Sequence, residues 1–380
     1  MPRNFKELKP AYGFDDVAIA PGDITINPEM ADISTNFDGI KLDIPFIASA
    51  MDAVVDPKFA IEMTKAGGLG VMNMDGLHTR YEDATVAYEE IASAPREEAT
   101  AIMQKIYSAP QKPELIAKKV EEVKKGGGTA AVSFVPQNAK RTAPLAVEAG
   151  ADMIVVQGTV VTARHSSKSL KGLVFADLIK DLNVPVLVGN TVSYEVTKEL
   201  MQQGIAGVMV GVGPGSVCTS REVLGIGIPQ VSATVECAAA RDDFFKETGK
   251  HIPIITDGGI RTGGDVCKSF AAGANAVMIG SPFAKTEEAP AHGYHWGMAT
   301  WHDSLPRGTR INMGTEYSLH QLLYGPSSRT DGTLNLVGAL QVCMGYVGAE
   351  NLREMNKARM VYAPAIKTEG KIYQAAGLGS

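Results

Sequence analysis

Eight short apolar runs recur along this chain, and they constrain its fold more than any other feature. The runs are rich in Ile, Val and Ala, and they alternate with segments that have the pattern of amphipathic helices. Near-continuous apolar strands between helices are typical of a parallel sheet that helices cover. The predicted strands are IPFIASA (44–50), LGVMNM (69–74), TAAVSF (129–134), MIVVQG (153–158), PVLVGN (185–190), GVMVGVG (207–213), PIITDGG (253–259) and AVMIGS (276–281).

Eight strands of this kind predict an α/β fold that closes as a (β/α)8 TIM barrel. An open doubly wound sheet is the alternative. We expect a single domain over residues 1–380, because barrels commonly exceed the usual ~150 residues per domain. Most runs end in Gly, Asn, Asp or Ser, so the loops at the carboxyl ends of the strands are expected to form the functional site.

Composition excludes several classes of function. A net charge of −6 argues against a nucleic-acid surface. The N-terminus MPRNFKELKP lacks the apolar core of a signal peptide, and no stretch approaches the ~18 apolar residues of a membrane span. The cysteines show no C-x-x-C spacing, which argues against a zinc cage or a redox pair; they are Cys218, Cys237, Cys267 and Cys343. We therefore expect a cytoplasmic protein with reduced thiols and no nucleic-acid or membrane partner.

Two regions interrupt the rhythm of strands and helices. Residues 75–127 carry charges spaced for i,i+4 pairs, so we expect solvent-facing helices there, and no residue in them signals chemistry. Residues 285–335 are rich in His, Trp, Arg, Gly and Pro and have no sustained period. Long loops on a barrel rim are usually functional, so we expect 285–335 to be a mobile active-site flap. For Trp296 and Trp301 in this segment, packing in the core or at the rim is the default interpretation.

The segment GVGPGSVCTSREVLGIGIPQ (211–230) has the strongest chemical signal. It leaves a predicted strand, places several glycines in a row, and then sets Cys218 between small polar residues. Glycine permits a close approach of backbone amides to an anion, and Ser216 adds a hydroxyl donor. This loop can therefore carry both a phosphate and a nucleophile, although a lone cysteine is more often a small buried apolar residue.

The loops after the last two predicted strands, DGGIRTGGDV (257–266) and MIGSPFA (278–284), form a second signal. In barrels these two loops often bind a phosphate. Asp257 is placed to accept hydrogen bonds from sugar hydroxyls. Amides and a hydroxyl for the phosphate would come from Gly258, Gly259, Gly280 and Ser281.

The chain resembles the IMP dehydrogenase/GMP reductase family in several strings that occur in family order. These strings span nearly the whole chain, and their combination is highly specific. They are FDDVAIAPGD (14–23), PFIASAMDAVVD (45–56), GPGSVCTSR (213–221), GIGIPQVSA (225–233), DGGIRTGGDV (257–266), AVMIGSPFAKTEEAP (276–290) and MGYVGAENLREM (344–355).

The resemblance implies a role for each matching residue. It makes Cys218 the thiolate that attacks C2 of the purine of GMP or IMP, and Asp257 the residue that binds the ribose diol. The implied 5′-phosphate site consists of Ser216, Gly259, Gly280 and Ser281. The residues implied to flank the nucleotide are Ser49 and Met51, and those implied to read the base edge from the flap are Met313 and Gly314.

The resemblance also implies cofactors and an assembly. The nicotinamide of NAD(H) or NADP(H) would be bordered by Asn190 and Gly211. Where dehydrogenases bind the cofactor through Asp-Ser-Ser after the fourth strand, this chain has Gln157-Gly158-Thr159, so Gln157 and Gly158 are the residues implied to contact the cofactor there. A K⁺ ion would bind carbonyl oxygens of Gly213, Gly215 and Cys218, and the tetramers of the family imply a homotetramer or a higher homo-oligomer here.

Two further departures from the family pattern matter. Long members carry a pair of CBS modules between the second and third barrel strands, where this chain has only residues 75–127, so regulation by adenine nucleotides through such modules is not expected. The family's threonine two residues after the cysteine is replaced by Ser220, which keeps a hydroxyl for proton relay.

The direction of the reaction rests on the flap. In dehydrogenases an adjacent Arg-Tyr pair on the flap activates the water that hydrolyses the thioimidate. Here the only Arg-Tyr is Arg80-Tyr81, far from 285–335 in sequence, although Arg307 and Arg310 remain alternative bases. GMP reductase is therefore favoured over IMP dehydrogenase. A non-catalytic nucleotide-binding regulator is a third hypothesis, against which Cys218 argues.

A reductase also needs an acid that protonates the departing ammonia. A carboxylate hydrogen-bonded to the Ser220 hydroxyl suits this role. Asp331 is the first candidate and Glu316 the second, and for each of them a solvated loop carboxylate is the alternative interpretation.

Overall fold

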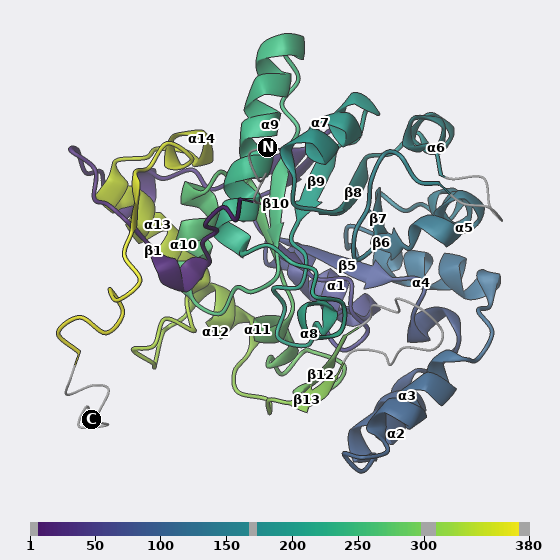
Figure 1. The fold of residues 1–380 in the computed structure, drawn as a ribbon. Helices are drawn as coiled ribbons and strands as arrows, with labels where there is room; N and C mark the ends of the chain where they lie inside the picture. The colour runs from purple at the N-terminus through teal and green to yellow at the C-terminus, as the bar shows by residue number, and fades with distance from the viewer. Residues whose placement is uncertain (1–6, 167–172, 298–308, 372–380) are drawn as a thin grey trace, which may run out of the picture.

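Eight parallel strands form a closed barrel in the computed structural model, which describes residues 7–166, 173–297 and 309–371 (Figure 1). Their order around the barrel is β10-β11-β4-β5-β6-β7-β8-β9. Seven of the predicted runs contain a whole strand, and the run 185–190 contains all of β8 but its last residue, so the predicted barrel is confirmed and the open sheet is excluded. The strands are β4 (Phe46–Ala48), β5 (Leu69–Asn73), β6 (Ala131–Phe134), β7 (Met153–Gln157), β8 (Val186–Thr191), β9 (Gly207–Val210), β10 (Ile254–Asp257) and β11 (Ala276–Ile279).

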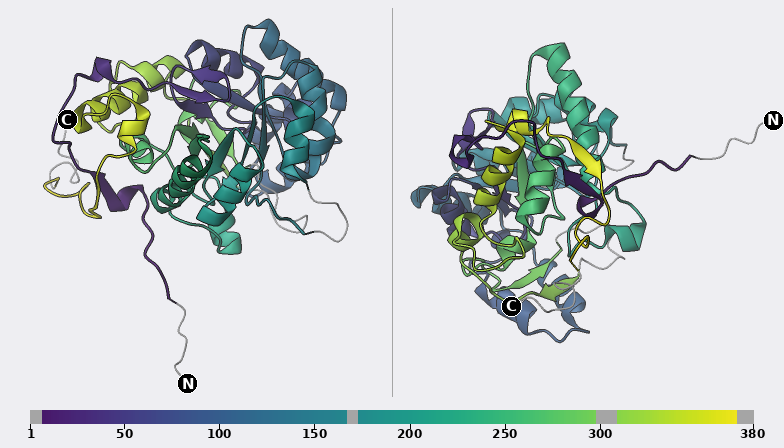
Figure 2. Two further views of the ribbon diagram at one scale, coloured as in Figure 1. Left: turned by 90° about the horizontal axis from the view of Figure 1, so that it is seen from above. Right: turned by 90° about the vertical axis from the view of Figure 1, so that its left-hand side faces the viewer.

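Helices cover the outside of the barrel (Figures 1 and 2). Their starts follow local signals: Asp56 caps the first of them by accepting a hydrogen bond from the Phe59 amide at 2.7 Å, and Pro57 occupies its first position. The covering helices are α1 (Pro57–Lys65), α4 (Pro113–Lys125), α5 (Pro136–Glu148), α6 (Phe175–Leu182), α7 (Tyr194–Gln202), α9 (Gln230–Thr248), α10 (Gly263–Ala271) and α13 (Leu336–Val347).

Side chains alternate between the inside and the outside of the barrel. In β7, Met153 and Val155 belong to the cluster inside the barrel, whereas Ile154 and Val156 pack under the helices. In β10, Ile255 points inward in the same way. Because alternate residues share a face, this register directs Gln157 and Asp257, which end these two strands, towards the barrel axis.

A hairpin closes the amino-terminal end of the barrel. It consists of β2 (Thr35–Phe37) and β3 (Ile40–Leu42), which pair antiparallel. Phe37 is fully buried and lies against Gly207, at the start of β9. Access to the barrel is therefore from the opposite end, where the strands finish.

The segment 75–127 consists of three helices. α4 packs between α1 and α5 as a member of the barrel's outer ring. The other two, α2 (Thr85–Ser93) and α3 (Ala99–Tyr107), form a pair at the edge of the molecule (Figure 1). Against this pair packs the two-stranded sheet of β12 (Tyr294–Trp296) and β13 (Arg310–Asn312), which belongs to the segment 285–335.

A strand near each end of the described chain contributes to a two-stranded sheet beside α10 (Figure 2). β1 (Val17–Ile19) pairs antiparallel with β14 (Met360–Tyr362). The remaining elements are η1 (Phe14–Asp16), η2 (Pro28–Met30), η3 (Leu77–Thr79), α8 (Ser220–Leu224), α11 (Ser281–Ala284), α12 (Leu319–Tyr324) and α14 (Leu352–Met355). Within the described residues, no helix has the length and apolar character needed to cross a membrane.

Candidate active site

A cavity of about 1270 Å³ opens at the carboxyl ends of the barrel strands. Its wall brings together most of the residues that the sequence singles out, although the most distant of them, Ser49 and Met313, are more than 250 positions apart in sequence. These residues are Ser49, Met51, Gln157, Gly158, Asn190, Gly211, Gly213, Gly215, Ser216, Cys218, Asp257, Gly258, Gly259, Gly280, Ser281 and Met313. The other predicted residues, Ser220, Gly314, Glu316 and Asp331, are not part of this wall.

Cys218 lies in the loop that follows β9, just before the short helix α8. The loop turns sharply, because the Cys218 amide donates to the Gly215 carbonyl at 3.0 Å. The Cys218 thiol donates to the Ser220 hydroxyl at 3.2 Å, and Ser220 is fully buried. A thiol that lines the cavity is thus paired with a hydroxyl behind it, which is the arrangement that a nucleophile with a proton relay needs.

The loops after β9, β10 and β11 meet at one side of the cavity. Ser216 and Ser281, which come from the first and last of these loops, share a hydrogen bond between their hydroxyls. Gly259 has a φ of +78°, and a Cβ there would lie 3.1 Å from the Cβ of Pro214. Glycine is therefore required where these loops approach each other, and the two hydroxyls converge on a space suited to an anion.

Asp257 accepts hydrogen bonds from two neighbouring strand ends. Asn190 Nδ2 donates to Asp257 Oδ2 at 2.8 Å, and Gln157 Nε2 donates to the same oxygen at 3.0 Å. The register of β8 shifts between Gly189 and Thr191, and such an irregularity re-aims a side chain, here that of Asn190. Burial raises the pKa of Asp257 to about 6, against the opposing effect of the two amide donors.

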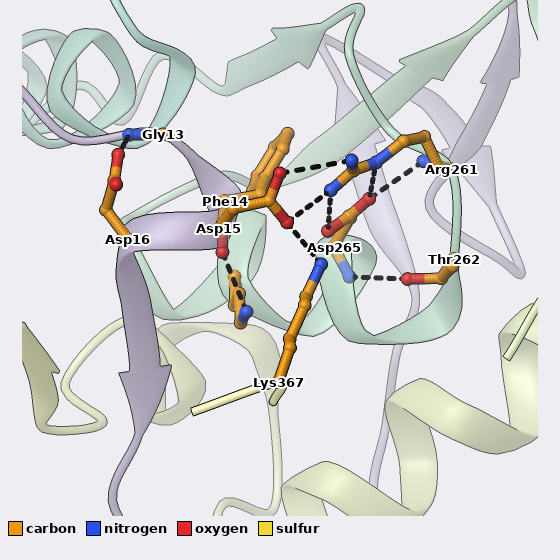
Figure 3. A network of polar contacts seen from close by, with 9 residues as sticks. Gly13, Phe14, Asp15, Asp16, Arg261, Thr262, Asp265 and Lys367 are labelled. Atoms are coloured by element: carbon orange, nitrogen blue, oxygen red, sulfur yellow. Dashed lines mark hydrogen bonds and ion pairs between the residues drawn. The ribbon is translucent and has the colours of Figure 1, made fainter. Parts of the chain in front are cut away.

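Ion pairs anchor the loop that follows Asp257 to both ends of the chain (Figure 3). Arg261 donates to Asp265 at 2.9 Å and to Asp15 at 2.8 Å, and Lys367 also pairs with Asp15. The two cations hold the pKa of Asp15 well below its usual range. Arg261 lines the cavity, and neither it nor Asp15 had been singled out from the sequence; the signal was the string DGGIR itself.

The two candidate acids of the flap have partners other than Ser220 in the structure. Glu316 pairs with Lys285 at 2.8 Å and with Arg329, and these cations lower its pKa. Asp331 is exposed and accepts from the Thr333 hydroxyl at 2.6 Å, which lowers its pKa as well. Both carboxyls are therefore ionised at neutral pH before any ligand binds.

The flap arginines are engaged away from the cavity or lie outside the described residues. Arg310 donates to the carbonyls of Ile91 and Ala92 at the end of α2 and stacks over Tyr294, with 5.4 Å from its guanidinium carbon to the ring centroid. Arg307 and Trp301 are among the residues that the structure does not describe. Trp296 is 1% exposed and donates from its indole nitrogen to the Tyr107 hydroxyl at 2.9 Å. For Trp296 the default interpretation, core packing, describes this environment.

The cavity also has a wall that sequence reasoning missed, because 75–127 carries no recognisable motif. Arg80 lines the cavity and donates to carbonyls of Asp75 and Ala109. The Asp75 carboxylate accepts from the Gln111 side chain at 2.8 Å. The Arg80-Tyr81 pair is thus distant from the flap in sequence, but its arginine reaches the same cavity.

Comparisons with known proteins agree with this site. Residues 11–302 match the family described as the IMP dehydrogenase / GMP reductase domain. An uncharacterized oxidoreductase of Mycolicibacterium smegmatis is 39% identical to the chain, over 91% of the chain and 95% of that protein. An inosine-5′-monophosphate dehydrogenase of Cryptosporidium parvum is 30% identical, over 93% of the chain and 92% of that protein.

A solved structure is similar over the same extent. The crystal structure of an IMP dehydrogenase/GMP reductase-like protein from Corynebacterium glutamicum superposes with a TM-score of 0.89 and 34% sequence identity, covering 94% of this chain and 96% of that one. The matched residues include the barrel, the cysteine loop and the loops of the cavity. The family implies a nicotinamide dinucleotide cofactor and purine nucleotide substrates. The chain therefore belongs to the IMP dehydrogenase/GMP reductase family of oxidoreductases.

Proposed function

We propose that this protein is a GMP reductase, which converts GMP and NADPH into IMP, ammonia and NADP⁺. The observation that carries the proposal is the placement of Cys218, paired with Ser220, on the wall of a cavity whose loops also offer an anion site and a carboxylate. The proposal predicts turnover of GMP through a covalent intermediate between Cys218 and the purine.

The substrate would span three groups of residues. The phosphate would bind the Ser216 and Ser281 hydroxyls together with amides of Gly259 and Gly280, and the ribose would bind Asp257. The Gly258 amide, which the sequence also offers to the phosphate, donates instead to the Met278 carbonyl at 3.2 Å. Both described donors to Asp257 act on Oδ2, so Oδ1 is the oxygen that can accept from ribose hydroxyls. Ser49, Met51 and the flap residues Met313 and Gly314 would flank the base.

Cys218 would act as the nucleophile of the reaction. Its thiolate attacks C2 of GMP, the C2–N bond to the amino group breaks, and protonated ammonia leaves. The Ser220 hydroxyl, 3.2 Å from the sulfur, is placed to pass the proton of the Cys218 thiol to the leaving amine. Asp331 and Glu316 remain the candidate acids, and either would have to take up a proton when the nucleotide binds, because both are ionised in this structure. Bound NADPH would supply the hydride that C2 takes up, and cleavage of the C2–S bond would release IMP and restore the Cys218 thiolate.

The cofactor would lie beside the ribose site. Gln157, Gly158, Asn190 and Gly211 border the cavity there, and the amides of Gln157 and Asn190 already orient Asp257. We keep NADPH and NADH as alternatives, to be distinguished by their KM values.

A potassium ion and a homotetramer complete the proposal. The carbonyls of Gly213, Gly215 and Cys218 belong to the loop between β9 and α8, in which the Cys218 amide donates to the Gly215 carbonyl at 3.0 Å, and carbonyl oxygens are the ligands that K⁺ takes. Activation by KCl but not by NaCl would support the ion. Light scattering of the purified protein would test the tetramer, and cell fractionation would test a cytoplasmic location.

The flap favours reductase over dehydrogenase. A dehydrogenase needs a base that activates water, but Arg310 donates to carbonyls of α2 and Arg329 pairs with Glu316. IMP dehydrogenase is the second candidate, because the C. parvum relative of that name aligns with 93% of this chain. Arg307 would then be the first base to test.

A spectrophotometric scan distinguishes the candidates. Oxidation of NADPH by GMP would support the reductase, and reduction of NAD⁺ by IMP the dehydrogenase. Binding of either nucleotide without any turnover would indicate the third hypothesis, a regulator. Ammonia release should equal NADPH consumption if the reductase proposal holds.

A further inference from the structure

His295 lies at the centre of β12, and its side chain faces away from the α2–α3 pair. Its neighbour Trp296 packs into the apolar cluster with Tyr107 and Ile91. Because successive side chains of a strand point to opposite faces, His295 is directed to the other side, towards the barrel mouth. It lines the cavity, although only 2% of its surface is exposed.

The imidazole packs on the phosphate-binding side of the cavity. A Cβ placed on Gly280 would lie 3.4 Å from both Cε1 and Nε2 of His295, and 3.3 Å from the sulfur of Met51. The ring edge that carries Nε2 therefore covers the backbone of Gly280. The next residue is Ser281, whose hydroxyl is bonded to that of Ser216.

His295 has an unused polar atom in this buried position. Nδ1 is buried and has no hydrogen-bond partner among the described residues. Burial lowers the pKa of His295 to about 4, so the ring is neutral at physiological pH and carries one N–H. A proton on Nδ1 would leave a buried donor unpaired, whereas a proton on Nε2 places the donor on the edge that meets Gly280.

We propose that His295 is a further phosphate-binding residue, whose Nε2–H donates a hydrogen bond to the 5′-phosphate of the bound nucleotide. This inference rests on the proposed nucleotide substrate and assigns a role to a residue of the flap segment. A neutral donor buried against Gly280 adds a directed contact to the hydroxyls of Ser216 and Ser281. A side chain at residue 280 would have to fit between the ring, 3.4 Å from its Cβ, and the Met51 sulfur at 3.3 Å.

The test compares a nucleotide with its nucleoside in calorimetry, without cofactor, so that no turnover occurs. IMP and inosine are suitable because IMP is a ligand in both directions of the reaction. His295→Phe should weaken IMP binding at least about tenfold, as expected for loss of a hydrogen bond to a charged group. Inosine binding should stay within about twofold of the unaltered protein.

Two variants separate the donor from the packing of the ring. Glutamine places an amide N–H near the position of Nε2, so His295→Gln should restore IMP affinity to within about threefold. His295→Gln that binds IMP as weakly as His295→Phe would overturn the Nε2 contact. Equal losses for IMP and inosine, or no loss for either ligand, would overturn the phosphate role.

A third ligand makes the inference testable apart from the proposed function. Ribose 5-phosphate has the phosphate and the sugar but no purine. If purine nucleotides do not bind, the proposed function fails, but a weaker affinity of His295→Phe for ribose 5-phosphate would still support the phosphate contact. Unchanged affinity for ribose 5-phosphate would overturn it.

Discussion

The nucleotide end of the cavity and its flap end are built in different ways. At the nucleotide end, Asp257 ends β10, Ser281 closely follows β11, and Cys218 lies in the loop between β9 and α8. At the flap end, Glu316 and Asp331 come from a long segment with little regular structure, and their carboxylates bond to Lys285, Arg329 and Thr333. Cys218, Asp257 and Ser281 line the cavity, whereas the carboxylates of Glu316 and Asp331 are not part of its wall.

This difference suggests that the nucleotide end determines substrate binding and that the flap end determines the direction of the reaction. Every member of such a barrel family can use the same strand ends to hold a purine nucleotide, because the closed sheet fixes where they converge. The choice between hydride transfer and hydrolysis depends on groups that reach the covalent intermediate from the flap. We therefore expect substitutions at the two ends to have separable effects on affinity and on turnover.

Removal of the nucleophile should have the largest effect. Cys218→Ala is expected to lower kcat by at least ~10⁴-fold, since no covalent intermediate can form, with IMP affinity changed by no more than about tenfold. Cys343→Ala, which alters a partly buried thiol on α13, is the matched control and should keep its activity. Steady-state rates and calorimetry measure the two effects, and appreciable turnover by Cys218→Ala would remove the covalent mechanism.

The flap carboxylates should show the next largest effect. Asp331→Asn is expected to lower kcat by about 10²-fold or more, as for a general acid, while KM for GMP changes little. Glu316→Gln retains the shape but weakens the pairing with Lys285 and Arg329, and should have a smaller effect. If instead Glu316→Gln is the slower variant, Glu316 is the acid. If both variants are as active as the unaltered protein, neither carboxylate is the general acid.

Asp257 tests the contribution of the nucleotide end of the cavity to binding. Asp257→Asn should weaken inosine binding by about 10- to 100-fold, because hydrogen bonds to a charged group contribute roughly 1.5–3 kcal/mol. The variant's kcat at saturating GMP should change much less than that of Cys218→Ala. Unchanged affinity in calorimetry would show that the ribose lies elsewhere.

The pKa of about 6 gives Asp257 a pH signature. The ionised carboxylate accepts from the ribose, so inosine affinity should be complete above about pH 7 and decline as the pH falls through 6. Inosine is used because a nucleotide's phosphate also titrates near pH 6. The decline should disappear in Asp257→Asn, and a decline of the same size in that variant would assign it to another group.

Sequence reasoning reached the two ends of the cavity to different degrees. Strand-end residues such as Cys218 and Asp257 could be predicted because apolar runs mark the strands and barrel topology places their ends together. Arg80 and His295 could not, because they reach the cavity through the packing of α2, α3 and β12, which no local pattern records. The partners of Glu316 and Asp331 were equally hidden, since an ion pair depends on where a long loop turns.

Product formation from IMP and NAD⁺, measured beside that from GMP and NADPH, tests the direction of the reaction most directly. We predict steady oxidation of NADPH with one ammonia released per turnover. With IMP and NAD⁺ we predict a burst of about one NADH per active site that then stalls, because a missing general base commonly costs ~10²–10⁴-fold. Sustained XMP production near the ~10 s⁻¹ enzyme median, with no ammonia released from GMP, would contradict the account.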